Sequence, residues 1–236
     1  MARFRAPVTA LALVIALLAL FALVAPATAL AQAQSQSRAQ SQAQAKAQAQ
    51  NQGWRSLTDG KTLQGWTTVG DVKWTVVDGA LAANPSTQSK EPLQGFLRST
   101  ETFGDFELTA EFFAAEDANS GLMIRCGAPA KPGSLGSCYE INISDNHAVT
   151  PTGGIVGVQS PLPYRVKSVG KWSLFEVRAE GSHLVVKVNG ETITDAHDDK
   201  YSNGAIGLQA GGPNGPGLIK FRNIKVRPLS TAGGAR

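Results

Sequence analysis

The 236-residue sequence lacks several features that identify large classes of proteins. It contains no nucleophilic serine or cysteine motif, no phosphate-binding loop and no dinucleotide fingerprint, which argues against the enzyme classes that depend on them. Beyond Gly53, apolar residues nowhere recur at helical spacing over several turns, so a helical domain is not expected. Lysine and arginine do not cluster among aromatic residues as they do on nucleic-acid-binding surfaces, and no nucleic-acid partner is expected.

The first 31 residues have the order of a secretory signal peptide. Arg3 and Arg5 precede an uncharged apolar run from Val8 to Val24, and Ala29-Leu30-Ala31 then forms a small-x-small cleavage site. A membrane anchor that is kept is the alternative, but the run is short for a span of about 20 residues. No cysteine follows Ala31 to accept a lipid. We therefore expect cleavage, no retained membrane span, and an exported protein in the periplasm or outside the cell.

Residues 32–52 consist almost entirely of glutamine, alanine and serine. Alanine and glutamine favour helix, but a segment without an apolar stripe has nothing to dock, so we expect a flexible spacer. Residues 53–229 have the usual length of one domain, and residues 230–236 are expected to form a frayed tail.

The domain shows short β-strand patterns separated by Gly, Asn, Asp and Pro. The segment 188–191 is typical of a tight hairpin, because its central Asn and Gly both accept positive φ. Many short strands with turns between them predict an all-β fold, a sandwich of two antiparallel sheets. The expected strands are 73–77, 81–83, 96–98, 106–113, 121–126, 139–144, 154–159, 173–179, 183–188, 191–195, 205–210 and 219–227.

Alternation within these strands indicates which side chains face the core. In residues 106–113 the side chains of one parity are all apolar, and in residues 139–144 Tyr139, Ile141 and Ile143 share one face. We therefore expect one apolar and one polar sheet face.

Four polar residues on that face come from strands that are neighbours in sequence and are therefore expected to pair: Glu111, Arg125, Glu140 and Asn142. Acids that accept hydrogen bonds and an arginine that donates them suit a polyhydroxylated ligand when they converge on one sheet. The same group can equally be a set of structural salt bridges. Spacing alone leaves both interpretations open.

Cys126 and Cys138 are the only cysteines, and they bracket a Gly- and Pro-rich loop between two expected strands. In an exported chain they predict a disulfide, which for a loop of this size contributes ~3 kcal/mol by restricting the unfolded chain. If the two cysteines were directly opposite in a regular ladder, Arg125 would pair with Tyr139 and would not share a face with Glu140. Either a β-bulge shifts the register near the loop or Arg125 lies apart from Glu140.

A series of segments, in order along the chain, resembles the 3-keto-disaccharide hydrolase family. Residues 57–66, LTDGKTLQGW, are similar to the LFDGKTLDGW with which that family opens, although Thr58 stands where the family usually has Phe. The other matching segments are 104–108, 111–112, 119–121 with Arg125, 139–146, 170–172, 188–190, 204–209 and 221–224. The resemblance therefore covers about residues 54–229.

The resemblance implies a concanavalin-like jelly roll and an enzyme that cleaves 3-keto-glycosides, including 3-keto-disaccharides, by eliminating the aglycone and hydrating the resulting glycal. This chemistry needs a base for the C2 hydrogen, an acid for the leaving oxygen and a positive group at the enolate. We expect Glu140 to be the base or a metal ligand and Glu111 to be the second acid. Arg125 or a bound divalent cation is expected at the enolate oxygen.

The carbohydrate substrate is expected to be bound by Asn142, Asn119, Asp145, His147 and Gln209, which lie in or beside the matching segments. His147 belongs to an expected loop, where an imidazole acts as an acid, a base or a ligand, or has no role. Two alternatives to an enzyme remain, because fold does not fix function. They are a non-catalytic, lectin-like carbohydrate-binding module of the same fold and a structural domain without a small ligand.

Overall fold

The computed structural model divides the chain into two units, Met1–Gln52 and Gly53–Arg236. The residues that it describes are 32–42, 53–90, 93–130, 134–159, 166–212 and 215–229. In the first unit, residues 32–42 form an exposed α-helix, as their alanine and glutamine content favours. The expected signal segment 1–31 and the expected tail 230–236 lie outside the described residues. Within the described ranges, no helix has the length and apolar character needed to cross a membrane.

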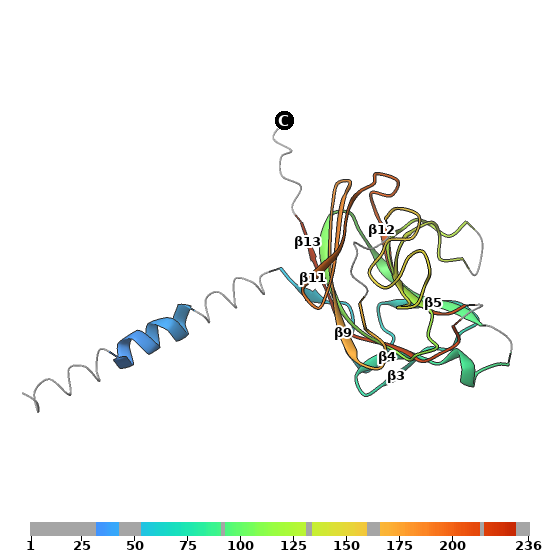
Figure 1. The fold of residues 1–236 in the computed structure, drawn as a ribbon, viewed down its shortest axis with the longest axis horizontal. Helices are drawn as coiled ribbons and strands as arrows, with labels where there is room; N and C mark the ends of the chain where they lie inside the picture. The colour runs from blue at the N-terminus through green and yellow to red at the C-terminus, as the bar shows by residue number, and fades with distance from the viewer. Residues whose placement is uncertain are drawn as a thin grey trace, which may run out of the picture. The chain divides into compact units, whose positions relative to one another are not determined.

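The second unit is built almost entirely from β-strands (Figure 1). They are β1 (Arg55–Ser56), β2 (Trp66–Gly70), β3 (Thr75–Val77), β4 (Ala80–Ala83), β5 (Gln94–Phe103), β6 (Phe106–Ala114), β7 (Ser120–Cys126), β8 (Tyr139–Ile143), β9 (Trp172–Glu180), β10 (His183–Val188), β11 (Glu191–His197), β12 (Gly204–Gly211) and β13 (Ile219–Pro228). A short 3-10 turn, Pro85–Thr87, follows β4.

The strands form two antiparallel sheets. The eight-stranded sheet has the order β11-β10-β9-β6-β13-β4-β3, with β1 also paired to β13, and the five-stranded sheet has the order β2-β5-β12-β7-β8. In Figure 1, β9, β11 and β13 lie on one side of the domain, and β5 and β12 lie on the other. The chain passes repeatedly between the sheets, for example from β6 to β7, which gives a jelly-roll sandwich. The predicted all-β, two-sheet fold is confirmed.

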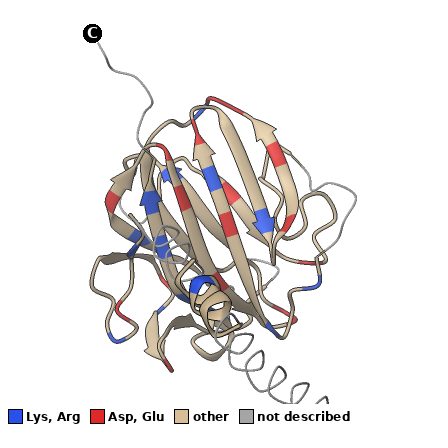
Figure 2. Ribbon diagram, turned by 90° about the vertical axis from the view of Figure 1, so that its left-hand side faces the viewer, with Lys and Arg blue, Asp and Glu red and all other residues tan. Residues whose placement is uncertain are grey.

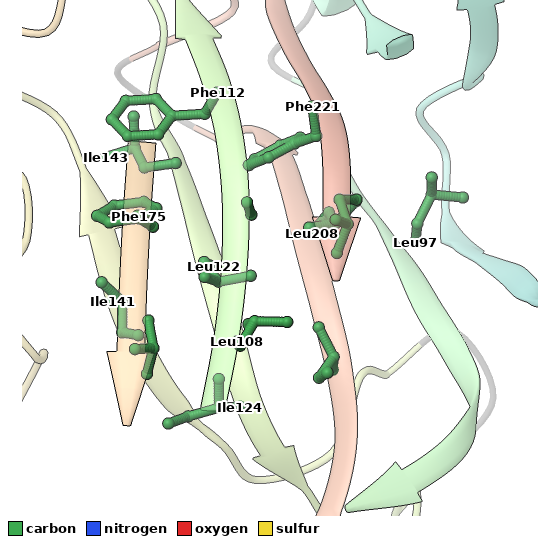
Figure 3. Close-up of a cluster of buried hydrophobic side chains, with 14 of the residues drawn as sticks. Leu97, Leu108, Phe112, Leu122, Ile124, Ile141, Ile143, Phe175, Leu208 and Phe221 are labelled. Atoms are coloured by element: carbon green, nitrogen blue, oxygen red, sulfur yellow. The ribbon is translucent and has the colours of Figure 1, made fainter. Parts of the chain in front are cut away.

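The core lies between the inner faces of the two sheets. Leu108 and Phe112 of β6 belong to the same buried cluster as Leu122 and Ile124 of β7, so residues of both sheets meet there (Figure 3). Fully burying one such side chain contributes about 1.5–3 kcal/mol, which fixes the parity of each strand. The positions between them point away from the core, to what we call the outer face of each sheet.

Several segments differ from the strands expected from the sequence, including β1, which was not expected, and β5, which is longer than the expected 96–98. Residues 154–159 form turns with isolated bridges, among them Ile155 to Ile141, instead of a strand. Ile155 is fully buried, which accounts for the apolar signal of this segment. Strand β2 was not expected, because Trp66 is its only buried residue and it shows no regular alternation.

The end of β7 contains a β-bulge at Arg125. Between the pairs Met123/Gly207 and Cys126/Ala205, β7 has two residues where β12 has one. Arg125 has a φ of 53°, in the left-handed region. The extra residue reverses the side on which the following residue lies, so Cys126 shares the outer face with Met123. The register shift considered from the sequence is therefore present.

Candidate functional site

The strongest candidate site is a hollow on the outer face of the five-stranded sheet. Its volume is about 380 Å³, within the range of small-molecule pockets. The sheet contributes Gln94 and Phe96 of β5, Met123 of β7 and Glu140 of β8. The segment before β8 contributes Ser134, Leu135, Gly136 and Cys138, which we call the loop wall.

Glu140 is the acid among the residues that line this hollow. It lies opposite Met123 in the β7–β8 ladder, so both side chains belong to the outer face. Its carboxylate has no hydrogen bond or ion pair with any residue in the described ranges, and burial alone raises its pKa. A shielded, unpaired carboxylate with a raised pKa is a stronger base than an ordinary surface glutamate.

Gln209 of β12 and Gly121 of β7 lie beside Glu140. Gln209 is only 5% exposed, and its Oε1 has no hydrogen-bond partner in the described part of the chain. A β-carbon at position 121 would lie 3.2 Å from Gln209 Oε1 and 3.2 Å from Glu140 Cγ. The amide and the carboxylate therefore flank the gap left by the missing side chain of Gly121. Glu140 lines the hollow, where the hydroxyl groups of a ligand can reach its carboxylate, whereas Gln209 Oε1 is buried behind it.

The expectation that Glu111 shares a face with Glu140 is wrong. Glu111 lies on β6 in the eight-stranded sheet, opposite Arg222 of β13. It accepts hydrogen bonds from Arg222 Nε and Asn223 Nδ2, each at 2.7 Å. Burial acts to raise the pKa of Glu111, but these hydrogen bonds and the charges of Arg222 and Lys225 lower it. Glu111 is therefore part of a surface ion pair on the eight-stranded sheet, whereas the hollow lies on the five-stranded sheet.

Arg125 also lies outside the hollow, contrary to expectation. Its side chain is fully buried and donates hydrogen bonds to the carbonyls of Gly104 (3.0 Å), Gly181 (2.7 Å) and Tyr201 (3.1 Å). It also pairs with the Asp105 carboxylate at 2.9 Å. The structural salt bridge that the sequence left open is what the structure shows for both Arg125 and Glu111.

Asn142, Asp145 and His147 hold the loops that follow β8. Asn142 Nδ2 donates to the carbonyl of Thr150. Asp145 accepts hydrogen bonds from the backbone N–H of Ser168 at 2.6 Å and from its hydroxyl at 2.7 Å. His147 Nδ1 accepts a hydrogen bond from the N–H of Thr150 at 2.9 Å. These polar atoms already have partners within the protein, and a role for the three residues in substrate binding stays a prediction.

Asn119 lies immediately before β7, at the end of the strand opposite the disulfide. A β-carbon at Gly212 would lie 3.2 Å from Asn119 Nδ2 and 3.8 Å from Gln94 Nε2. Asn119 therefore lies near Gln94, one of the residues that line the hollow. The structure thus brings Asn119 and Gln209 close to the hollow that contains Glu140.

The predicted disulfide between Cys126 and Cys138 is present. Cys126 forms a small apolar cluster with Met123, Leu135 and Ala205, separate from the main core, and Cys138 packs against it. This cluster fixes the loop wall to the outer face of the sheet.

No metal-ligand group emerges from the described residues: nowhere among them do three or more His, Cys, Asp or Glu side chains gather to hold an ion. The divalent cation considered from the sequence therefore has no assigned ligand set among the described residues.

Sequence reasoning missed several residues that shape the hollow, including Gln94, Phe96, Met123, Gly121 and Leu135. The alternation of the strand could have predicted that Phe96 faces outward, because its neighbour Leu97 is fully buried in the core. No pattern in the sequence indicates that the loop containing Leu135 folds back over the sheet.

The fold is a jelly-roll β-sandwich, and the outer face of its five-stranded sheet carries a hollow lined by the carboxylate of Glu140 and the amide of Gln94. The chain belongs to the family of 3-keto-alpha-glucoside-1,2-lyase-like domains, whose family model matches residues 53–227. The family resemblance noted from the sequence is confirmed. No curated protein matches the chain.

Several solved structures share the fold. A candidate glycosyl hydrolase from Parabacteroides distasonis superimposes with a TM-score of 0.64 at 18% identity, covering 77% of this chain and 96% of that one. A second from the same organism has a TM-score of 0.57 at 25% identity, covering 75% and 99% of the two chains. The carbohydrate-binding module CBM66 from Bacillus subtilis has a TM-score of 0.51 at 20% identity, covering 69% and 95%.

Proposed function

We propose that the domain binds a 3-keto-glycoside in the hollow and cleaves it, with Glu140 as the general base. The observation that carries the proposal is the unpaired, shielded carboxylate of Glu140 beside the unpaired Oε1 of Gln209. Family membership supports the substrate class, and the candidate glycosyl hydrolases of the same fold support an activity on sugars.

The reaction begins with the removal of a proton from a carbon acid. The ketone at C3 acidifies the C2 hydrogen, so the Glu140 carboxylate takes that proton and the electron pair forms an enolate. The side-chain amide of Gln94, which lines the hollow, is a neutral donor for the enolate oxygen. A raised pKa makes Glu140 a more effective base, provided that it is ionised at the working pH.

Elimination and hydration complete the reaction. The enolate electrons form the C1–C2 double bond as the C1–O bond breaks, and the leaving oxygen takes up the proton that Glu140 holds. Water then adds across the double bond, with hydroxyl at C1 and hydrogen at C2, and gives the free keto-sugar. One carboxyl group can move both protons, so the chemistry does not require Glu111 in the site.

The second candidate function is a carbohydrate-binding module without catalysis. It is favoured by one observation: Glu140 is the single acid among the described residues that line the hollow, because Glu111 belongs to the other sheet. The similarity in fold to a carbohydrate-binding module is compatible with it.

We also propose that the protein is exported, with residues 1–31 removed as a signal peptide and residues 32–52 acting as a spacer. The disulfide supports this, because such bonds persist in oxidising compartments. Mass spectrometry of the protein from its native host is expected to find the N-terminus at Gln32. An intact N-terminus would contradict the proposal.

The catalytic proposal is tested with Glu140→Gln in the full chain, given 3-keto-disaccharides and plain disaccharides. We expect turnover of the keto forms alone, a fall of about 10²–10⁴-fold in kcat for the variant, and retained binding. Glu176→Gln, a change on the outer face of the other sheet, is the matched control and is expected to keep full activity. If the unmodified protein binds 3-keto-disaccharides without turning them over, the catalytic proposal is wrong and the binding-module proposal is supported. A parallel assay with a chelator tests whether the activity needs a divalent cation.

A further inference from the structure

We propose that the Cys126–Cys138 disulfide is a positioning element of the hollow, which holds the loop wall over the sheet, and is not a brace that the sandwich needs in order to form. The proposal deepens the function proposed above. The expected effect on substrate turnover rests on that function, whereas the expected effect on the Glu140 environment does not.

The sandwich around the disulfide is joined without it. Strands β7 and β8 pair through a continuous ladder from Ser120/Ile143 to Ile124/Tyr139. The hydrogen bond from the N–H of Gly127 to the carbonyl of Ser137, 2.9 Å long, extends this pairing past the ends of the strands. Neither cysteine belongs to the main core between the sheets. Breaking the disulfide therefore leaves the strand pairing and the main core intact.

Within the described residues, the loop wall is attached to the sheet by the packing of Leu135, and to the other arm of the loop by the Gly127–Ser137 hydrogen bond and the disulfide. Leu135 is 6% exposed and packs against Gly207 of β12. A β-carbon at Gly207 would lie 3.0 Å from Leu135 Cδ2. The other arm of the loop is held separately, because Arg98 of β5 donates to the carbonyls of Cys126 (3.2 Å) and Gly127 (3.1 Å). The disulfide is the covalent link between the held arm and the arm that carries the wall.

The link acts close to the proposed base. Cys138 lies two residues before Glu140, and both line the hollow. The raised pKa of Glu140 has burial as its cause, and Cys138 and the rest of the wall line the space that Glu140 faces. A wall that swings away admits water to the carboxylate, so its pKa is expected to fall towards the ordinary value. The same movement removes one side of the ligand's binding surface.

The test uses the full chain with Cys126→Ala and Cys138→Ala combined, since alanine suits the buried position of Cys126. The first readout is the pKa of the Glu140 carboxyl, measured by carbon-13 NMR and assigned by its loss in Glu140→Gln. The second is the hydrogen-exchange protection of the β8 amides. Leu135→Ala, which keeps the disulfide and trims the wall, is the second route to the same effect. Val77→Ala, an exposed change in the other sheet, is the control.

We expect a lower Glu140 pKa in the cysteine variant and in Leu135→Ala, unchanged protection of β8, and a fall of about tenfold to hundredfold in kcat/KM for 3-keto-disaccharides. An unchanged Glu140 pKa would overturn the proposal, and so would the loss of β8 protection together with the disulfide. If the unmodified protein turns over no keto-sugar, the proposed function fails, and the NMR titration still decides whether the disulfide positions the wall.

Discussion

Glu107 and Glu111 on the eight-stranded sheet differ from Glu140 on the five-stranded sheet in whether their carboxylates have partners. On the eight-stranded sheet, Glu107 bonds to Arg178 at 2.7 Å and to Arg227, and Glu111 pairs with Arg222 at 2.7 Å. Figure 2 shows acidic and basic positions interspersed along the strands of the domain. On the five-stranded sheet, the Glu140 carboxylate has no partner among the described residues. Completed ion pairs indicate a scaffold, whereas unsatisfied acceptors in a hollow indicate a place for a ligand.

The two glutamates that the sequence placed together show this contrast most directly. The pKa of Glu111 is lowered because its hydrogen bonds and neighbouring positive charges outweigh its burial. The pKa of Glu140 is raised because burial acts on it without compensation. The same residue type is therefore stabilised as an anion on one sheet and disfavoured as an anion by burial on the other.

The largest effect is expected where a completed set of bonds is broken in the interior. Arg125→Met removes the guanidinium that pairs with Asp105 and donates to three carbonyls, so we expect a loss of about 3–5 kcal/mol in the free energy of unfolding. Denaturant unfolding measures it. Arg178→Met, an exposed arginine in the surface network, is the matched control and should cost less than about 1 kcal/mol. Equal losses of stability in Arg125→Met and Arg178→Met would show that burial of the arginine does not determine the loss.

A smaller effect, confined to function, is expected from filling the gap in the hollow. In Gly121→Ala the new methyl group approaches Gln209 Oε1 and Glu140 Cγ to 3.2 Å and displaces both. We expect about a tenfold fall in kcat/KM with a change in stability below about 1 kcal/mol. Gly104→Ala, where the nearest atom would be at 3.7 Å, is the control and should retain activity. Full activity in Gly121→Ala would place the reacting atoms elsewhere.

The smallest expected effect is an opposite pH dependence of stability in two glutamine variants. The lowered pKa of folded Glu111 stabilises the protein above the unfolded value of about 4.3, and this contribution disappears as pH falls through the folded pKa. Glu111→Gln is therefore expected to cost about 0.5–1 kcal/mol at neutral pH and less in acid.

The raised pKa of folded Glu140 has the reverse consequence. The folded state holds the proton to higher pH than the unfolded state, so stability falls as pH rises from the unfolded pKa to the folded one. Glu140→Gln is expected to be neutral in acid and stabilising at neutral pH. The free energies of unfolding of Glu111→Gln and Glu140→Gln, measured across this pH range, check the two predictions. If both variants show the same pH dependence, the two glutamates do not differ in their electrostatic environment.

Much of the fold could be predicted from alternation, because burying the side chains of one parity is what most strongly stabilises these strands. Strand β6 shows this clearly, with every second residue from Phe106 to Ala114 buried. Strand β2 gives no such signal, since it lies at a sheet edge and buries only Trp66. Residues 154–159 give a misleading one, because Ile155 is buried beside β8 without forming a strand.

The site was only partly predictable, because alternation gives the parity of a residue and not the sheet that it joins. Glu111 and Glu140 both face outward, as expected, yet β6 and β8 belong to different sheets. Arg125 was misplaced for another reason: the bulge rotates it out of the ladder and into the interior. Family resemblance added Gln209, which lies beside Glu140, although its part in binding stays a prediction.

The bulge at Arg125 also determines how this fold can be altered. Because the bulge turns Cys126 to the outer face, the chain leaves β7 on that side of the sheet, and none of the described residues 127–130 and 134–137 belongs to the main core. Segments of other lengths can therefore be grafted between Cys126 and Cys138 while the buried residues of both sheets remain as they are. The position is a natural point at which variation can reshape a binding surface without redesigning the scaffold below it.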